Sequence, residues 1–180
     1  YADRLVKAFL NNKIISPIPK KYSRNIIAAQ KFRKLCESKV IRPISGFKAA
    51  GTGIPLLKKL NEKEPFYATV YKHNVLNNKR GVKINKFTLG VELEVCYLIK
   101  KSFFYFKLNI TKKNLKKFIS HIAPCIEVVG YRQKKKGIKS LGDICSDFGG
   151  NVKFILGPKK KFKNQNVKNL KTFITNKKIN

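Results

Sequence analysis

The chain has 180 residues, of which 43% are hydrophobic, and its formal net charge is +32, from 41 basic and nine acidic residues. This length and apolar content suit one packed domain with a small appendage and argue against disorder over most of the chain. No apolar run is long enough to span a membrane, and the first residues do not form a signal peptide.

The positive charge makes a polyanion such as RNA one candidate partner, because clustered Lys and Arg attract phosphates. The basic residues are mostly Lys, however, and they are spread along the chain. Arg, which base readout and bidentate phosphate recognition favour, is rare. Lys, Asn and Ile have AT-rich codons, so a biased genome also explains the composition. Nucleic-acid binding is therefore possible but not favoured.

The first forty residues are predicted to be helical. Apolar positions in 2–12 have helical spacing, and Ser16–Pro19 then breaks the helix. Ser23 can cap a second helix over about 24–38. We therefore expect a helical N-terminal segment over residues 1–40.

From Ile41 onward, short apolar runs alternate with Gly, Pro and Asn, which predicts a sheet-rich domain over 41–180. A helix is expected over 110–119, with Thr111 as its cap. The absence of Met and a strand-like 171–175 followed by a turn suggest a C-terminally truncated fragment. The expected strands are 44–49, 66–70, 90–99, 122–129 and 152–156.

The cysteines and histidines do not form a zinc motif. The cysteines are far apart with no C-x-x-C pair, and neither His73 nor His121 has a ligand-like neighbour. Such cysteine usage is typical of a reducing, cytoplasmic setting. The four are Cys36, Cys96, Cys125 and Cys145.

Glu92 and Glu94 lie in an apolar, strand-like run. Side chains alternate along a strand, so both carboxylates project from one face, where they repel each other unless a hard cation lies between them. A solvated strand face is the alternative explanation. Glu62 and Glu64 form a second acid-x-acid pair in a loop-like setting, so the spacing alone is a weak signal.

Several further motifs follow one another along almost the whole chain. They are Ala2–Val6 with Ile18–Pro19, Ala28–Gln30, Gly46–Ala50, Glu64–Ala68, Gly90–Glu94, Ala123–Arg132, and Cys145–Asp147 with Phe154–Pro158. In this order and spacing they resemble the 2-keto-4-pentenoate hydratase branch of the fumarylacetoacetate hydrolase superfamily. The resemblance implies an α+β fold: a short helical N-terminal part followed by a β-rich mixed sheet or roll, incomplete at the C-terminus.

The resemblance also implies a site. Glu92, Glu94 and Glu127 correspond to the carboxylates that bind one Mg²⁺ or Mn²⁺ in the family, and Lys48 corresponds to an acid/base candidate. Asp147 is a second catalytic candidate, expected to orient Lys48 or a water. Substrate-binding roles are expected for Arg132, as a carboxylate fork, and for Tyr67, as a pocket-lining side chain.

The implied reaction is the addition of water to a short 2-hydroxydienoate or 2-oxo-enoate, by an enzyme of aromatic catabolism. A 2-oxo-3-hexenedioate decarboxylase of the same family and a non-catalytic basic protein that binds a polyanion are the alternatives. The full-length protein is expected to form a homo-oligomer. The chain departs from the family pattern at Ala50, Ala68, Gly130 and Phe148.

Overall fold

The computed structural model describes residues 1–77, 81–82, 84, 88–105, 109–134 and 140–167. The chain divides into two compact units: residues 1–92 with 126–155, and residues 93–125 with 156–180. Strands β4 (Thr88–Ile99) and β5 (Ile119–Gly130) run through both units. The division at residue 40 expected from the sequence stays a prediction. In the described part of the chain, no helix is long and apolar enough to cross a membrane.

The larger unit begins with two helices, α1 (Ala2–Leu10) and α2 (Ile26–Ser38). One face of α1 is buried, as its apolar spacing predicted. The cap of α2 was wrongly predicted: the side chain of Asn25, not Ser23, accepts the N–H of Ala28 at 2.9 Å, so the helix begins two residues later. A short 3-10 turn, η1 (Lys20–Tyr22), separates the helices.

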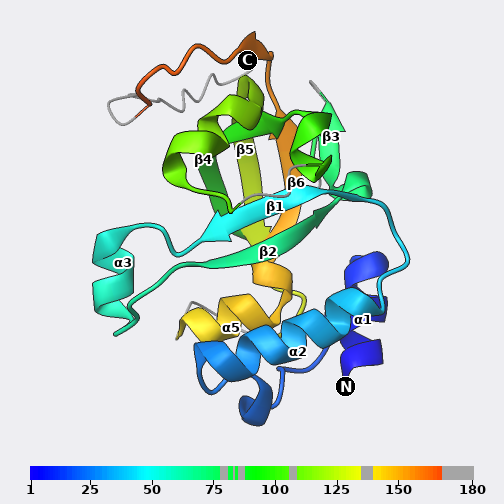
Figure 1. The fold of residues 1–180 in the computed structure, drawn as a ribbon. Helices are drawn as coiled ribbons and strands as arrows, with labels where there is room; N and C mark the ends of the chain where they lie inside the picture. Colours follow the sequence, from blue (N-terminus) through cyan, green and yellow to red (C-terminus); the bar gives the residue numbers. More distant parts are fainter. Residues whose placement is uncertain (78–80, 83, 85–87, 106–108, 135–139, 168–180) are drawn as a thin grey trace, which may run out of the picture. The chain divides into compact units, whose positions relative to one another are not determined.

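Helix α2 packs along α5 (Leu141–Ser146), as Figure 1 shows. Gly142 allows this close approach, because a Cβ atom there would lie 2.6 Å from the carbonyl oxygen of Ser23. Helix α3 (Ile54–Lys59) lies between two strands along the chain and is drawn at the left in Figure 1. The apolar core of the unit joins α1, α2 and the segment after α5, through Leu5, Phe9, Phe32, Tyr71 and Phe148.

Two of the predicted strands pair in an antiparallel sheet, β1 (Ile44–Ala50) with β2 (Phe66–Tyr71). Lys48 lies opposite Ala68 in this register. After β2 the chain passes through a 3-10 turn, η2 (Lys72–Asn74), into β3 (Val75–Asn77).

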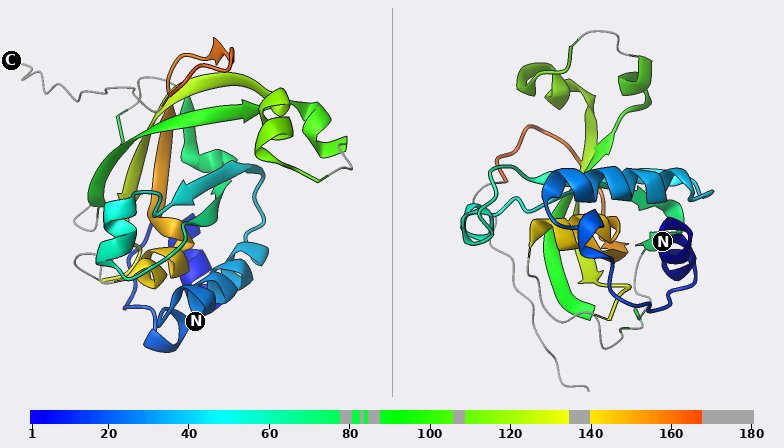
Figure 2. Two further views of the ribbon diagram at one scale, coloured as in Figure 1. Left: turned by 60° about the vertical axis from the view of Figure 1, so that its left-hand side comes forward. Right: turned by 90° about the horizontal axis from the view of Figure 1, so that it is seen from below.

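The second sheet has the strand order β3-β6-β5-β4, where β6 is Asn151–Leu156, and β7 (Lys160–Lys161) pairs with β5. Figure 2 shows β4 and β5 side by side along their lengths. The sheets and helices together confirm the predicted α+β class. The expected C-terminal strand at 171–175 lies outside the described residues.

The expected helix over 110–119 is only partly right. Thr111 does cap a helix, since its hydroxyl accepts the N–H of Asn114 at 3.3 Å. The helix α4 (Lys112–Leu115) is a single turn, however, and continues as the 3-10 turn η4 (Lys116–Phe118) before β5 begins. Two further 3-10 turns, η3 (Lys101–Tyr105) and η5 (Phe148–Gly150), complete the described elements.

Candidate metal centre

The three glutamates singled out in the sequence come together. Each offers a carboxylate oxygen, and these atoms all lie within 4.8 Å of one another. Glu92 and Glu127 belong to the larger unit, and Glu94 is two residues beyond Glu92 on the same face of β4. Glu127 is buried, whereas Glu92 and Glu94 are exposed. Carboxylates this close repel one another, so the cluster favours a bound cation.

Lys48 supplies a cation beside this cluster. Its ammonium group forms an ion pair and hydrogen bond with Oε1 of Glu127 and donates to the carbonyl oxygen of Gly149 at 3.2 Å. The side chain of Lys48 is 9% exposed and that of Glu127 is 2% exposed. A buried carboxylate is costly unless it is paired, so Lys48 compensates the charge of Glu127.

The position of the Lys48 side chain depends on Gly149, which was not predicted as a site residue from the sequence. Gly149 has a φ of +69°, and a Cβ atom there would lie 2.5 Å from the Cβ of Ala68 and 3.9 Å from the Cδ of Lys48. Only glycine fits this left-handed, closely approached position without a shift. The Gly149–Gly150 doublet was the available signal, because glycine pairs mark turns with positive φ.

The donor set fits a divalent cation with hard oxygen ligands. Calcium–oxygen distances of about 2.3–2.6 Å place opposite ligands up to about 5.2 Å apart, which accommodates the observed spread. Magnesium, at about 2.0–2.1 Å, places opposite ligands about 4.2 Å apart and adjacent ligands closer. The exposed side chains of Glu92 and Glu94 can rotate to suit either ion.

Arg132 and Asp147 form a second ion pair in the larger unit, with 3.0 Å between Nη1 and Oδ1. Asp147 also accepts the backbone N–H of Arg132 at 2.8 Å and the amide of Gln133 at 3.4 Å. The guanidinium donates to the carbonyl oxygen of Asn151 and lies over the ring of Phe9. Burial raises the pKa of Asp147 and lowers that of Arg132, while each partner opposes the shift of the other.

These contacts differ from the expected roles of the two residues. In the described part of the chain, the carboxylate of Asp147 accepts hydrogen bonds from Arg132 and Gln133, not from Lys48. The fork of Arg132 is occupied by protein oxygens, so it is not presented to a substrate in this structure. Their catalytic and substrate-binding roles therefore stay predictions, and the observed geometry is that of a structural ion pair.

Tyr67 lies on β2 with half of its surface exposed. The guanidinium of Arg33 is 5.1 Å from the centre of its ring, and Phe47 meets it edge-on at 6.0 Å. Tyr67 is therefore a strand tyrosine that packs against a cation and an aromatic ring. Its substrate-binding role stays a prediction.

Two of the departures from the family pattern have visible packing consequences. Ala68 is fully buried and occupies the space next to Gly149. Phe148 has a φ of +51°, a region where Asn is less strained than Phe. Its ring stacks on Phe9 at 4.1 Å between centroids, which offsets that strain by burial.

Neither the family models nor the curated proteins with which the sequence was compared match it. Among solved structures, the chain is similar to 4-oxalocrotonate decarboxylase from Pseudomonas putida G7. The complex with magnesium and adipate has a TM-score of 0.61 at 16% identity. The complex with calcium and acetate has a TM-score of 0.66 at 18% identity.

Each comparison covers 87% of this chain, which spans 60% of the neighbour. At this identity the likeness shows the fold, and that fold is the fumarylacetoacetate-hydrolase-like α+β architecture predicted from the motifs.

Proposed function

We propose that this chain carries the metal-binding part of a divalent-cation-dependent lyase of the fumarylacetoacetate hydrolase superfamily, acting on a short 2-hydroxydienoate or 2-oxo-enoate. One observation carries the proposal: the oxygens of Glu92, Glu94 and Glu127 lie within 4.8 Å, with Lys48 paired to Glu127, on a fold similar to that of a metal-complexed enzyme. Hydration is the first candidate reaction, because the motifs resemble the hydratase branch.

The three carboxylates would hold the cation, Mg²⁺ or Mn²⁺, and leave part of its coordination shell for the substrate. When bound, it would stabilise negative charge that develops on the 2-oxo oxygen of the substrate. Lys48 would donate or accept a proton at the substrate carbon chain from its Nζ atom. The Gly149 carbonyl and the Glu127 carboxylate orient that Nζ atom, and the 9% exposure of Lys48 limits competing contact with water.

A decarboxylase acting on a short 2-oxo acid is the second candidate. Both of the solved structures named above are of a decarboxylase, which favours this reaction over other lyase chemistry. Hydration and decarboxylation both need charge stabilisation at the 2-oxo group, so the same carboxylates and Lys48 would serve either.

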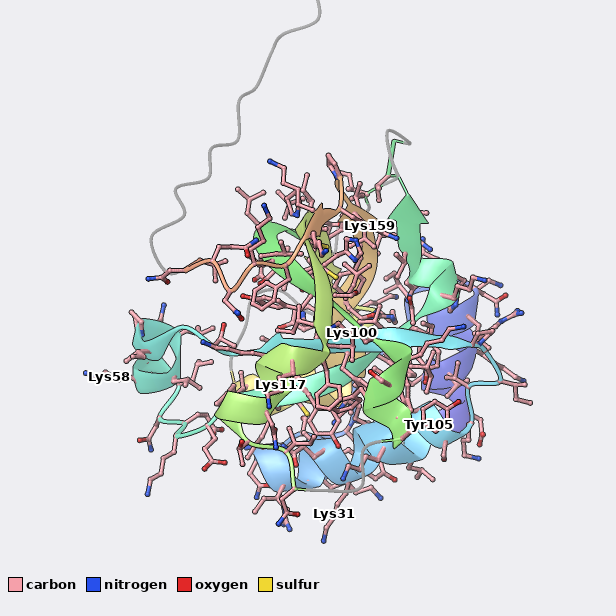
Figure 3. The ribbon with its side chains drawn as sticks, turned by 45° about the horizontal axis from the view of Figure 1, so that its top comes forward. Lys31, Lys58, Lys100, Tyr105, Lys117 and Lys159 are labelled. Carbon is pink, nitrogen blue, oxygen red and sulfur yellow. The ribbon has the colours of Figure 1, made fainter. Side chains whose placement is uncertain are left out.

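A polyanion-binding protein without catalysis is less well supported. Figure 3 shows labelled lysines on separate elements, such as Lys31 on α2, Lys58 on α3 and Lys117 on η4. A nucleic-acid interface normally gathers its basic residues along one element or face. Lysines carried by several separate elements also fit the compositional explanation.

Calorimetric titration with Mg²⁺ and Mn²⁺ tests the metal site directly. We expect saturable binding that is lost in a Glu92→Gln/Glu127→Gln variant. The matched control is Glu62→Gln/Glu64→Gln, which removes the same charge from the other acid-x-acid pair. Equal loss in both variants, or no binding by the unaltered chain, would overturn the metal site.

The reaction is then assayed with the purified protein. Metal-dependent loss of a 2-hydroxydienoate without release of carbon dioxide supports the hydratase, and release of carbon dioxide from a 2-oxo-enedioate supports the decarboxylase. If the protein binds the metal but turns over neither substrate, the metal site stands and both proposed reactions are wrong.

A further inference from the structure

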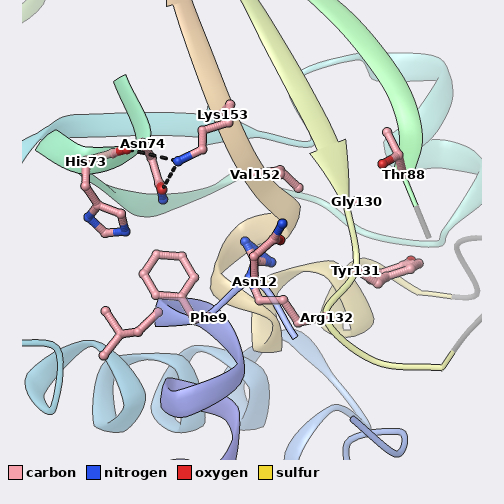
Figure 4. A pocket seen from close by; sticks show the side chains of 11 residues that line it. Phe9, Asn12, His73, Asn74, Thr88, Gly130, Tyr131, Arg132, Val152 and Lys153 are labelled. Atoms are coloured by element: carbon pink, nitrogen blue, oxygen red, sulfur yellow. Dashed lines mark hydrogen bonds between the residues drawn. The ribbon is translucent and has the colours of Figure 1, made fainter. Parts of the chain in front are cut away.

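The larger unit contains a second polar site, separate in its residues from the carboxylate cluster. A cavity of about 190 Å³ lies among the end of α1, the turn η2 and the start of β6 (Figure 4). Its lining includes Phe9, Asn12, His73, Asn74 and Lys153. None of Lys48, Glu92, Glu94 or Glu127 lines it.

Lys153 places a positive charge at this cavity. Its Nζ atom donates to the carbonyl oxygen of His73 at 2.9 Å and to Oδ1 of Asn74 at 3.3 Å, as the dashed lines in Figure 4 show. An ammonium group has three N–H donors, so these two neutral acceptors leave one for a ligand. Among the described residues, no carboxylate lies within ion-pair distance of Lys153.

The other groups around Lys153 do not balance its positive charge. Partial burial, and then the charge of Arg132, lower the pKa of Lys153. Partial burial also lowers the pKa of His73, with smaller contributions from the charges of Lys153 and Arg42. Asp147, the one carboxylate paired to Arg132 in the described part of the chain, is already fully buried in that pair. The cavity is therefore short of an anion.

The ring of His73 is held in place beside the cavity. Its centroid lies 5.7 Å from that of Phe9, edge-on, and 6.1 Å from that of Tyr71. Held in this way, the ring can present a nitrogen to a ligand with little loss of side-chain entropy. The side-chain amides of Asn12 and Asn74 add further hydrogen-bonding groups at the same cavity.

We propose that this cavity binds a small oxyanion, with Lys153 as its charged anchor and His73 and Asn12 as hydrogen-bonding partners. Its volume of about 190 Å³ is enough for a phosphate or a small carboxylate. The site does not depend on the proposed lyase function.

NMR titration of the full chain with inorganic phosphate tests the site, at an ionic strength held constant with sodium chloride. A parallel titration with acetate distinguishes a phosphate from a carboxylate ligand. We expect saturable shifts at His73 and Asn74, and Lys153→Met should weaken binding at least about tenfold, since hydrogen bonds to charged groups are among the strongest. The control Lys58→Met removes an exposed lysine of α3 and should leave binding unchanged.

If Lys153→Met does not fold, Lys153→Gln removes the charge while keeping donors for His73 and Asn74. Shifts that do not saturate for either anion, or that sodium chloride alone reproduces, overturn the site. Equal weakening in Lys153→Met and Lys58→Met overturns it as well, because the effect would then come from overall charge.

Discussion

Two ion pairs of the larger unit are alike in composition and burial but differ in what surrounds them. Lys48–Glu127 and Arg132–Asp147 each join a cation to a carboxylate, and both pairs are almost fully buried. Around Arg132 and Asp147, the hydrogen bonds go to backbone groups, to Gln133 and within the pair. Around Lys48 and Glu127, two more carboxylates, Glu92 and Glu94, lie within reach.

This difference separates a structural pair from a candidate functional one. A buried pair whose hydrogen bonds are met by protein groups stabilises one arrangement and has little left for a ligand. A pair with further carboxylates beside it has more negative than positive charge, which a divalent cation would balance. We therefore expect that changing the Arg132–Asp147 pair affects stability alone. Changing the Lys48–Glu127 pair should affect both stability and metal binding.

The largest effect is expected for Arg132→Met. This change leaves the Asp147 carboxylate buried without its cation, which costs about 3–5 kcal/mol of unfolding free energy. Urea denaturation measures the loss. Added Mg²⁺ should not restore stability, and a restoration by Mg²⁺ would mean that this pair, too, belongs to the metal site.

Gly149→Ala should be the next most destabilising change. The added methyl group meets Ala68 at 2.5 Å and the residue keeps a φ of +69°, so overpacking and backbone strain together should cost about 2–4 kcal/mol. The matched control is Gly46→Ala, where a Cβ atom would meet nothing within 4 Å. Adding Ala68→Gly to Gly149→Ala should recover the packing part of the loss, and no recovery would contradict this account.

Lys48→Met should have a smaller effect that depends on metal. Without the ammonium group, Glu127 has lost its cation, and we expect a loss of about 1–3 kcal/mol in metal-free buffer. A divalent cation should restore more stability to this variant than to the unaltered chain, since it would replace the lost charge. Thermal denaturation with and without Mg²⁺ measures this, and an equal gain in both proteins would count against a shared site.

The sequence predicted the elements of the fold better than their ends. Apolar spacing indicated α1, because burial of one face imposes a period on its side chains. Alternation also predicted strand β4, although Val91 and Leu93, opposite its glutamates, are exposed in the structure. The cap of α2 was assigned to Ser23 instead of Asn25, since both residues are good caps and only the packing of the chain selects between them.

For the site, the motifs grouped Glu92, Glu94 and Glu127, and their carboxylate oxygens do lie within 4.8 Å of one another. Their role as metal ligands stays a prediction. The pairing of Arg132 with Asp147, and of Lys48 with Glu127, could not be read from the chain, because each pair joins residues from different elements. The cavity at Lys153 was missed for the same reason: a single lysine among many carries no local signal until the fold surrounds it.

The smallest expected effect concerns His73, which belongs to neither ion pair. Its pKa is lowered below the ordinary value of 6.5, so between the two values the unfolded chain binds more protons than the folded chain. Unfolding free energy should therefore rise as pH increases through this window, and the His73 contribution should be complete above 6.5. Urea denaturation across this range should show a shallower slope for His73→Gln than for the control His121→Gln. Identical slopes would mean that neither the partial burial of His73 nor the charges of Lys153 and Arg42 lower its pKa in the folded chain. That result would weaken the contrast between this cation-rich cavity and the anion-rich cluster at Glu127.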